Sequence, residues 1–210
     1  MSVAGVLLAA GGGRRMGTPK ALLRDERGVP FLDRAIGTLL EGGCATVTVV
    51  LGAAADDARG LLGRDGWLDD PAVTVVEAAD WDTGMGASLR AGLDALSTRG
   101  VADDDAEVVD VALVSLVDLP DVGPAVVARL CDVAAGPTTL ARATYRGEPG
   151  HPVLLGREHW AGAAGSATGD KGARDYLTTH ALREVECGDL ATGRDVDHPS
   201  DLPRGGEPRP

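Results

Sequence analysis

The most constraining feature of the sequence is an apolar run near the N-terminus that breaks into three consecutive glycines. The run Val6–Ala10 leads directly into Gly11–Gly13, and Arg14, Arg15 and Lys20 follow within one short loop. Glycine lacks a Cβ atom and adopts positive φ angles at little cost, so backbone amides in such a loop can approach an anion closely. This order of residues predicts a β-strand that ends in a phosphate-binding loop.

Two well-known phosphate-binding loops fit this stretch poorly. A Walker loop needs Ser or Thr after its lysine, but Ala21 follows Lys20. A dinucleotide fingerprint is matched only loosely by Gly11–Gly17, because the bulky Arg15 and Met16 precede the last glycine. An isolated glycine-rich turn is more often a plain surface turn, but the preceding strand and the following cations favour a binding loop here.

Alternating strand and helix patterns follow the loop along the chain. A helix is expected over Phe31–Glu41, because apolar residues recur there at helical spacing between Pro30 and Gly42. We expect further strands at 47–51, 73–76 and 108–117, and further helices at 53–62, 88–96 and 123–134. This alternation predicts an α/β fold with a Rossmann-like, doubly wound and mostly parallel sheet.

The pattern becomes less regular after residue 138. Shorter strands are expected around Tyr145 and Val153, and a helix at 173–179. We interpret residues 1–202 as one domain, with a nucleotide-binding half at 1–135 and an acceptor-binding half at 136–202. The tail 203–210 contains three prolines and two glycines and is expected to be flexible.

Composition excludes several classes of function. The net charge of −12 argues against nucleic-acid and membrane-surface binding, because both of these partners are anionic. Cys44, Cys131 and Cys187 are scattered, so no disulfide framework or zinc site is indicated. No apolar segment approaches the roughly 18 residues of a membrane-spanning helix. We expect a cytoplasmic protein whose anionic ligands are met by local clusters of positive charge.

The N-terminal loop resembles the L-A-A-G-x-S-x-R-M-G…P-K signature of the molybdenum cofactor cytidylyltransferases and the related guanylyltransferases, with Gly13 in place of the usual Ser. Five later segments resemble further motifs of this MobA-like NTP transferase family in the right order: Thr83–Arg90, Asp118–Pro120, Gly150–Val153, Gly169–Arg174 and Asp195–Pro199. The resemblance therefore covers nearly the whole chain, and it implies a nucleotidyltransferase fold of the GT-A-like type.

Two carboxylates are the candidate metal ligands. Asp118 directly follows the predicted central strand, and Mg²⁺ typically takes one or two carboxylates together with substrate phosphates. The resemblance places the second ligand at Asp197, although its neighbour Asp195 is an alternative, since a strand here would point both side chains to the same side. For Asp118 and Asp197 alike, capping of a nearby helix is the structural alternative.

The resemblance also implies the residues that contact each substrate. The nucleotide-binding residues are Leu8, Ala9, Ala10, Gly11, Gly12, Gly13, Arg15, Lys20, Gly84 and Ser88. Relatives usually carry Asn or Asp where this chain has Ala78, which weakens the inference of a nucleotide contact there. His151 and Lys171 are the candidate acceptor-binding residues, and Lys20 and Lys171 are the only lysines of the chain. As structural alternatives, Ser88 and Asp170 could each cap a helix.

These residues together predict a Mg²⁺-dependent nucleotidyltransferase with Arg15, Lys20 and Asp118 in catalytic roles. The resemblance implies that the phosphate of molybdopterin attacks the α-phosphorus of CTP and releases pyrophosphate. CTP is favoured over GTP because guanylyl relatives usually read L-A-G-G, and Ala10 carries most of that choice. A molybdoenzyme or its chaperone is the expected protein partner.

Three other functions stay open at this point. The chain could be a transferase of the same fold that acts on another phosphorylated acceptor. It could be an oxidoreductase with a flavin or nicotinamide site, since the same family includes nicotine blue oxidoreductase. It could also be a non-catalytic cofactor chaperone, although its retention of Lys20 and Asp118 speaks against that.

Overall fold

A computed structural model describes residues 2–102 and 109–201 of the chain. Its seven-stranded sheet has the order β3-β2-β1-β4-β6-β5-β7. The strands are β1 (Ser2–Leu8), β2 (Thr46–Leu51), β3 (Val73–Glu77), β4 (Val109–Leu116), β5 (Leu140–Tyr145), β6 (Glu148–Gly156) and β7 (Arg183–Glu186). Strands β1 to β4 run parallel, β6 is antiparallel to both β4 and β5, and β5 runs parallel to β7. The predicted mostly parallel α/β sheet is confirmed.

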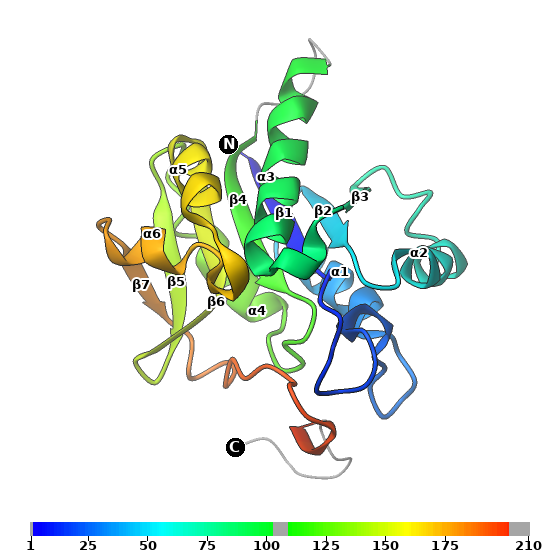
Figure 1. The fold of residues 1–210 in the computed structure, drawn as a ribbon. Helices are drawn as coiled ribbons and strands as arrows, with labels where there is room; N and C mark the ends of the chain where they lie inside the picture. The colour runs from blue at the N-terminus through cyan, green and yellow to red at the C-terminus, as the bar shows by residue number, and fades with distance from the viewer. Residues whose placement is uncertain (1, 103–108, 202–210) are drawn as a thin grey trace.

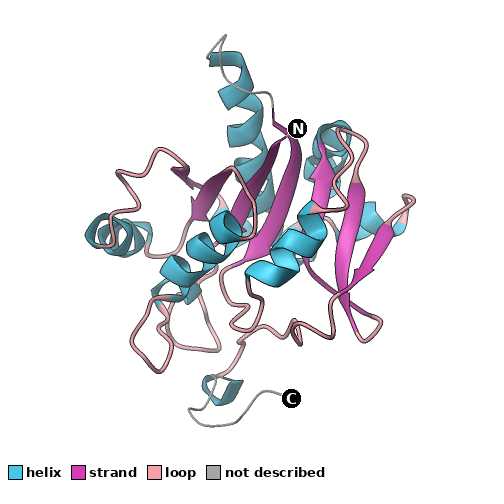
Figure 2. Ribbon diagram, turned by 180° about the vertical axis from the view of Figure 1, so that it is seen from behind, coloured by secondary structure: helices cyan, strands magenta, loops and turns pink. Residues whose placement is uncertain are grey.

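Helices cover both faces of this sheet (Figures 1 and 2). They are α1 (Phe31–Glu41), α2 (Ala55–Arg64), α3 (Met85–Ala102), α4 (Pro124–Cys131), α5 (Arg157–Ser166) and α6 (Arg174–Thr178). Residues of α1, α2 and α4 pack in one hydrophobic core, and residues of α3, α5 and α6 pack in a second core. In β1, Val3 and Leu7 face the first core while Ala4, Val6 and Leu8 face the second. A strand buried on both faces has to be apolar throughout, which explains the unbroken apolar run that opens the sequence.

Most predicted elements are present, with shifted ends that have local causes. The helix Phe31–Glu41 is confirmed at both ends. Helix α2 starts at Ala55 because Ala54 precedes it in the left-handed conformation, with φ 55°. Helix α4 starts at Pro124, whose fixed φ suits the first helical position. Helix α3 starts at Met85, three residues before the predicted start.

Two elements of the second half were not predicted. Helix α5 consists largely of Ala, Gly and polar residues, and only Trp160 and Ala163 are buried, so its sequence carries little helical periodicity. Strand β7 is a four-residue edge strand in which only Val185 is buried. Residue 108, which was assigned to the central strand, and the tail 203–210 lie outside the described residues.

The polarity of the strands decides where a site can form. Strands β1 to β4 end at one edge of the sheet, and the antiparallel β6 begins at that same edge. Ligands of open α/β sheets bind at the carboxyl ends of the parallel strands. The loops after β1, β3 and β4 and the first residues of β6 therefore surround the candidate site. Within the described residues, no helix is both long and apolar enough to cross a membrane.

Candidate active site at the carboxyl edge of the sheet

The loop after β1 folds back on itself around one glycine. Gly13 has φ 57°, and the amides of Met16 and Gly17 both donate to its carbonyl oxygen at 2.9 Å. A Cβ atom at Gly13 would lie 1.9 Å from the carbonyl oxygen of Thr18, so this path excludes any side chain. The departure from the family's usual Ser at this position therefore accompanies a loop conformation that only glycine can adopt.

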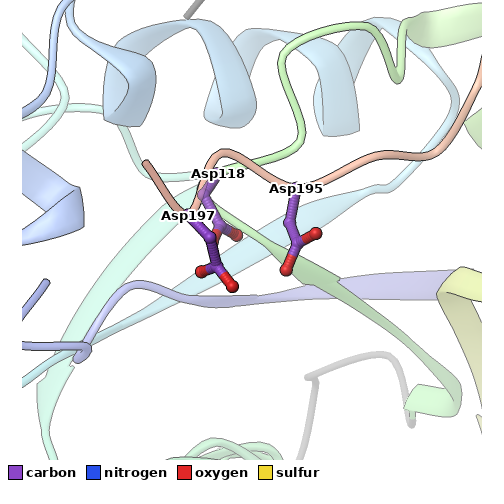
Figure 3. A group of neighbouring side chains, drawn as sticks. All are labelled: Asp118, Asp195 and Asp197. Carbon is purple, nitrogen blue, oxygen red and sulfur yellow. The ribbon is translucent and has the colours of Figure 1, made fainter. Parts of the chain in front are cut away.

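Three aspartates from two distant segments converge beside this loop. Asp118 lies at the end of β4, and the segment that carries Asp195 and Asp197 is held there by a hydrogen bond from Val196 N to the Asp118 carbonyl oxygen, at 3.0 Å. Figure 3 shows the three carboxylates gathered together. One oxygen from each lies within 4.8 Å of the others. Residues 195–197 form no strand, so alternation along a strand does not apply here, but the side chains of Asp195 and Asp197 both reach the cluster.

Lys20 and Arg15 pair with this cluster. Lys20 Nζ contacts a carboxylate oxygen of Asp118 and lies 2.6 Å from Asp197 Oδ1, while Arg15 Nη1 lies 2.9 Å from Asp197 Oδ2. The side chains of Asp118 and Lys20 are 7% and 19% exposed, whereas that of Arg15 is 68% exposed. Among the described residues, Asp195 has no hydrogen-bond or ion-pair partner for its carboxylate. The cluster therefore contains three ion pairs, in which Lys20 bridges Asp118 and Asp197 and Arg15 adds an outer pair to Asp197, together with the unpaired carboxylate of Asp195.

The environment shifts the pKa of each paired group. Burial raises the pKa of Asp118 above its ordinary value, and the nearby Lys20 ammonium offsets only part of that effect. Burial by itself would lower the pKa of Lys20, but the carboxylates of Asp118 and Asp197 outweigh it and hold that pKa above its ordinary value. The hydrogen bond from Lys20 lowers the pKa of Asp197. At neutral pH Lys20 is therefore a firmly charged cation between two carboxylates.

A cavity of about 570 Å³ opens over the loop and the aspartate cluster, and we refer to it as the first cavity. Nearly all of the predicted nucleotide-binding residues line it: Leu8, Ala10, Gly11, Gly12, Gly13, Arg15, Lys20, Gly84 and Ser88. Ala9 does not, because it is buried beneath the loop, where its amide donates to Val50 O at 2.9 Å. All three aspartates also line this cavity.

A second cavity of about 360 Å³ adjoins the first and contains both predicted acceptor-binding residues, His151 and Lys171. The two cavities share five lining residues and are therefore direct neighbours: Leu8, Met85, Leu116, Asp170 and Asp195. Burial lowers the pKa of His151 to about 4, so its imidazole is uncharged at neutral pH. Lys171 lies at the exposed rim, with its Nζ 3.1 Å from Asp175 Oδ2.

The helix-capping alternatives are wrong for all four residues concerned. Ser88 lies inside the first turn of α3, while Gly123 precedes α4 and Ala173 precedes α6, so neither Asp118 nor Asp170 occupies a cap position. The Asp197 side chain binds Lys20 and Arg15 instead of a helix terminus. Each of these polar residues is thus available to a site rather than used by local structure.

The sequence did not indicate one tryptophan that lines the first cavity or two arginines that line the second cavity. Trp81 lines the first cavity, and Arg142 and Arg174 line the second. Arg142 left a usable signal, because it is the one charged residue in the otherwise buried or small-residue strand β5. A charged side chain in such a strand is rarely buried without a reason.

Comparisons with known proteins agree with this architecture. Residues 5–185 match the model of the MobA-like NTP transferase domain. The chain is 36% identical to nicotine blue oxidoreductase from Paenarthrobacter nicotinovorans over 205 residues, or 93% of this chain and 92% of that protein. It is 36% identical to a probable molybdenum cofactor guanylyltransferase from Chloroflexus aggregans over 134 residues, or 60% and 58% of the two chains.

A solved structure is similar over nearly the full length. Rv0371c from Mycobacterium tuberculosis H37Rv superposes with a TM-score of 0.73 and 28% identity over 96% of this chain and 95% of that one. A complex of Rv0371c with manganese, with a TM-score of 0.69, is also similar. The family match, the full-length relative and the carboxyl-edge site agree, and the chain belongs to the MobA-like NTP transferase domain family.

Proposed function

We propose that this protein is a divalent-metal-dependent nucleotidyltransferase that transfers CMP from CTP to the phosphate of a molybdopterin-type cofactor. The observation that carries the proposal is the convergence of Arg15, Lys20, Asp118 and Asp197 beside a glycine loop that opens into a nucleotide-sized cavity. Family membership supports the transfer of a nucleotide.

The proposed reaction forms one bond and breaks one bond. An oxygen of the acceptor phosphate attacks the α-phosphorus of CTP, a new P–O–P link forms, and the bond to the β-phosphate breaks to release pyrophosphate. An ionised phosphate needs no general base to remove a proton, so the protein's task is to position the two substrates and stabilise charge. Lys20 and Arg15 are the cations placed to stabilise the negative charge that grows on the leaving pyrophosphate.

The donor set of the aspartate cluster fits a hard divalent cation. Carboxylate oxygens are the ligands such cations prefer, and Asp118 and Asp197 are the proposed ligands, with Asp195 nearby. Five aspartates but only three cations line the first cavity, so a triphosphate would meet surplus negative charge without a bound cation. When bound, Mg²⁺ would neutralise negative charge on the substrate phosphates. The manganese complex of the relative Rv0371c supports a divalent cation here.

The choice of CTP and of the acceptor rests on narrower support. Ala10 lines the first cavity, and the L-A-A-G sequence around it resembles the cytidylyl branch. The guanylyltransferase relative supports a molybdenum cofactor as acceptor, and a molybdoenzyme or its chaperone would then receive the product. The halves 1–135 and 136–202 would bind nucleotide and acceptor respectively, with the acceptor contacting His151 and Lys171.

One comparison favours a second candidate function. The relative that matches almost the whole chain is named as an oxidoreductase, which supports a family member recruited to redox chemistry. That function requires a flavin or nicotinamide in place of a triphosphate. The absorption spectrum of the purified protein, together with titration of flavins and nicotinamides, distinguishes the two candidates.

Calorimetric titration of CTP, GTP, ATP and UTP, each with and without Mg²⁺, tests the proposed function. We expect CTP to bind most tightly and only with Mg²⁺, and we expect this Mg²⁺-dependent binding to be lost in Asp118→Ala. Asp69→Ala is the matched control, since Asp69 is exposed in a loop outside both cavities. If no triphosphate binds to the wild-type protein, the proposal is wrong and the oxidoreductase takes its place.

A further inference from the structure

The second cavity combines an apolar floor with a charged upper wall. Its floor is built by core residues of the sheet and of α3, such as Leu89, Val114 and Val153. Its charged side chains are Arg142, Lys171, Arg174, Asp170 and Asp195. Positive charge therefore exceeds negative charge here, whereas the first cavity has the opposite balance. A ligand with an apolar or flat body and an anionic group matches this lining.

The three cations differ in how far their charge is already used. Lys171 is paired with Asp175 at the rim. Arg142 Nη2 lies 2.6 Å from Glu184 Oε1, but its Nε is buried with no hydrogen-bond partner among the described residues. The Arg142 side chain is only 16% exposed. Arg174 is exposed, and no described residue forms an ion pair or hydrogen bond with its guanidinium.

A buried N–H group without an acceptor is uncommon in proteins, because water cannot replace the missing bond. An arginine presents its donors as a planar fork that matches the oxygens of a phosphate, and a buried arginine is the usual partner of such a group. The Nε donor of Arg142 and the guanidinium of Arg174, which both line this cavity, are therefore free to bind an anion.

His151 lines the same cavity as the two arginines and Asp195. The charges of Arg142, Arg174 and Asp195 all act on its imidazole, although burial is the main cause of its lowered pKa. Its backbone is fixed, since Tyr145 Oη donates to its carbonyl oxygen at 2.6 Å and the Tyr145 ring packs on Gly150. His151, held in place by its backbone, and the two arginines thus belong to the lining of one cavity.

We propose that Arg142 and Arg174 form the anion subsite of the second cavity and hold a phosphate monoester carried by a small apolar or heteroaromatic molecule. This deepens the proposed function, on which it rests, because it assigns recognition of the acceptor's phosphate to Arg142 and Arg174 in addition to the proposed contacts with His151 and Lys171. It also excludes an uncharged molecule as the preferred ligand of this cavity.

Calorimetric titration of a matched pair of probes tests the subsite without nucleotide or metal. Pyridoxine 5′-phosphate and pyridoxine share a small heteroaromatic ring and differ by the phosphate, and inorganic phosphate serves as the third probe. We expect the phosphate ester to bind at least about 10-fold more tightly than pyridoxine. Inorganic phosphate is expected to bind more weakly than the ester, because it makes no contact with the apolar floor.

Arginine variants then locate the anion. Arg142→Gln and Arg174→Gln should each weaken binding of the ester at least about 10-fold and leave binding of pyridoxine unchanged. Arg183→Gln is the matched control, because this substitution removes the same charge from an exposed residue of β7 that lines neither cavity. The double variant Arg142→Gln/Glu184→Gln removes both members of the ion pair, which guards against a folding defect from an unpaired Glu184.

The outcomes separate this inference from the proposed nucleotide chemistry. Equal binding of the ester by wild type, Arg142→Gln and Arg174→Gln, or equal affinity for ester and pyridoxine, overturns the subsite. Failure of every triphosphate to bind overturns the proposed function, while loss of ester binding in the two variants would still establish the subsite. Binding of CTP should be unaffected in Arg174→Gln, because Arg174 does not line the nucleotide cavity.

Discussion

The two adjoining cavities differ in how their charges are balanced before any ligand arrives. In the first cavity the inner cation, Lys20, already contacts Asp118 and Asp197, and aspartates outnumber cations. In the second cavity cations outnumber aspartates, and two arginines have unused donors. An anion can therefore enter the second cavity by itself, whereas a triphosphate in the first has to arrive with compensating positive charge. The same edge of one sheet thus holds two adjoining cavities with opposite balances of charge.

The largest effect is expected from breaking the ion pair of the first cavity. Lys20→Ala and Asp118→Ala should each lower turnover at least about 100-fold, the scale seen when one electrostatic contact to a transition state is lost. The assay is pyrophosphate release from CTP with molybdopterin as acceptor. Arg183→Ala, which removes an exposed cation that lines neither cavity, serves as the control, and turnover close to wild type in Lys20→Ala or Asp118→Ala would contradict the assigned role.

Removal of divalent metal should change the ligand affinity of the first cavity but not that of the second cavity. With a chelator present, CTP affinity should fall at least about 10-fold, because the carboxylates of the first cavity then repel the triphosphate. Binding of pyridoxine 5′-phosphate to the second cavity should not change. Calorimetry on one protein preparation measures both ligands, and a parallel loss of both affinities would show that the cavities are not electrostatically distinct.

The first cavity could be predicted in detail from the sequence, because its parts lie in short segments with strong local signals. The glycines and Asp118 each come shortly after an apolar strand, Lys20 closes the loop that the glycines begin, and parallel strands bring their carboxyl ends to one edge. The pairing of Lys20 with both Asp118 and Asp197 could not be predicted, since it depends on a return of the chain after β7 that has no regular structure.

The second cavity was harder to predict because its residues come from elements with weak patterns. Arg142 and Arg174 lie on β5 and α6, which meet the site only through the antiparallel arrangement of β6 and the unpredicted edge strand β7. No local rule states that the Nε of Arg142 is left without a partner. Such a property arises from tertiary packing, so the sequence indicated His151 and Lys171 but not the two arginines.

Gly84, which lines the first cavity, packs against the backbone of Gly169, next to Asp170 of both cavities. Gly84, just before α3, has φ 121°, and a Cβ atom there would lie 2.3 Å from the carbonyl carbon of Gly169. Gly84→Ala should therefore reduce the free energy of unfolding by at least about 2 kcal/mol, from backbone strain and the clash together. Gly37→Ala in α1 is the matched control, with open space around its Cβ, and should increase stability by about 0.5–1 kcal/mol. Urea denaturation measures both, and equal effects would contradict the packing of this junction.

The smallest effect is expected from the Glu186 carboxylate, which binds the turn between β5 and β6. Glu186 accepts hydrogen bonds from the amides of Arg146, Gly147 and Gly188 and from Thr144 Oγ1, at 2.7 to 3.1 Å. Arg146 and Gly147 both have positive φ and form the turn between β5 and β6. These amide hydrogen bonds lower the pKa of Glu186 from 4.5 to about 2, whereas burial raises the pKa of Asp118 in the first region.

The pH dependence of stability follows from the sign of that shift. A carboxylate whose pKa is lower in the folded state stabilises the fold above its unfolded pKa, and this stabilisation is lost as the pH falls through the folded value. The Tm difference between wild type and Glu186→Gln should therefore be largest above pH 5 and shrink as the pH falls towards 2. Glu148→Gln, exposed at the start of β6, is the control for removing a charge from the same hairpin. A Tm difference that stays constant between pH 6 and pH 2 would mean that Glu186 holds the turn by its shape and not by its charge.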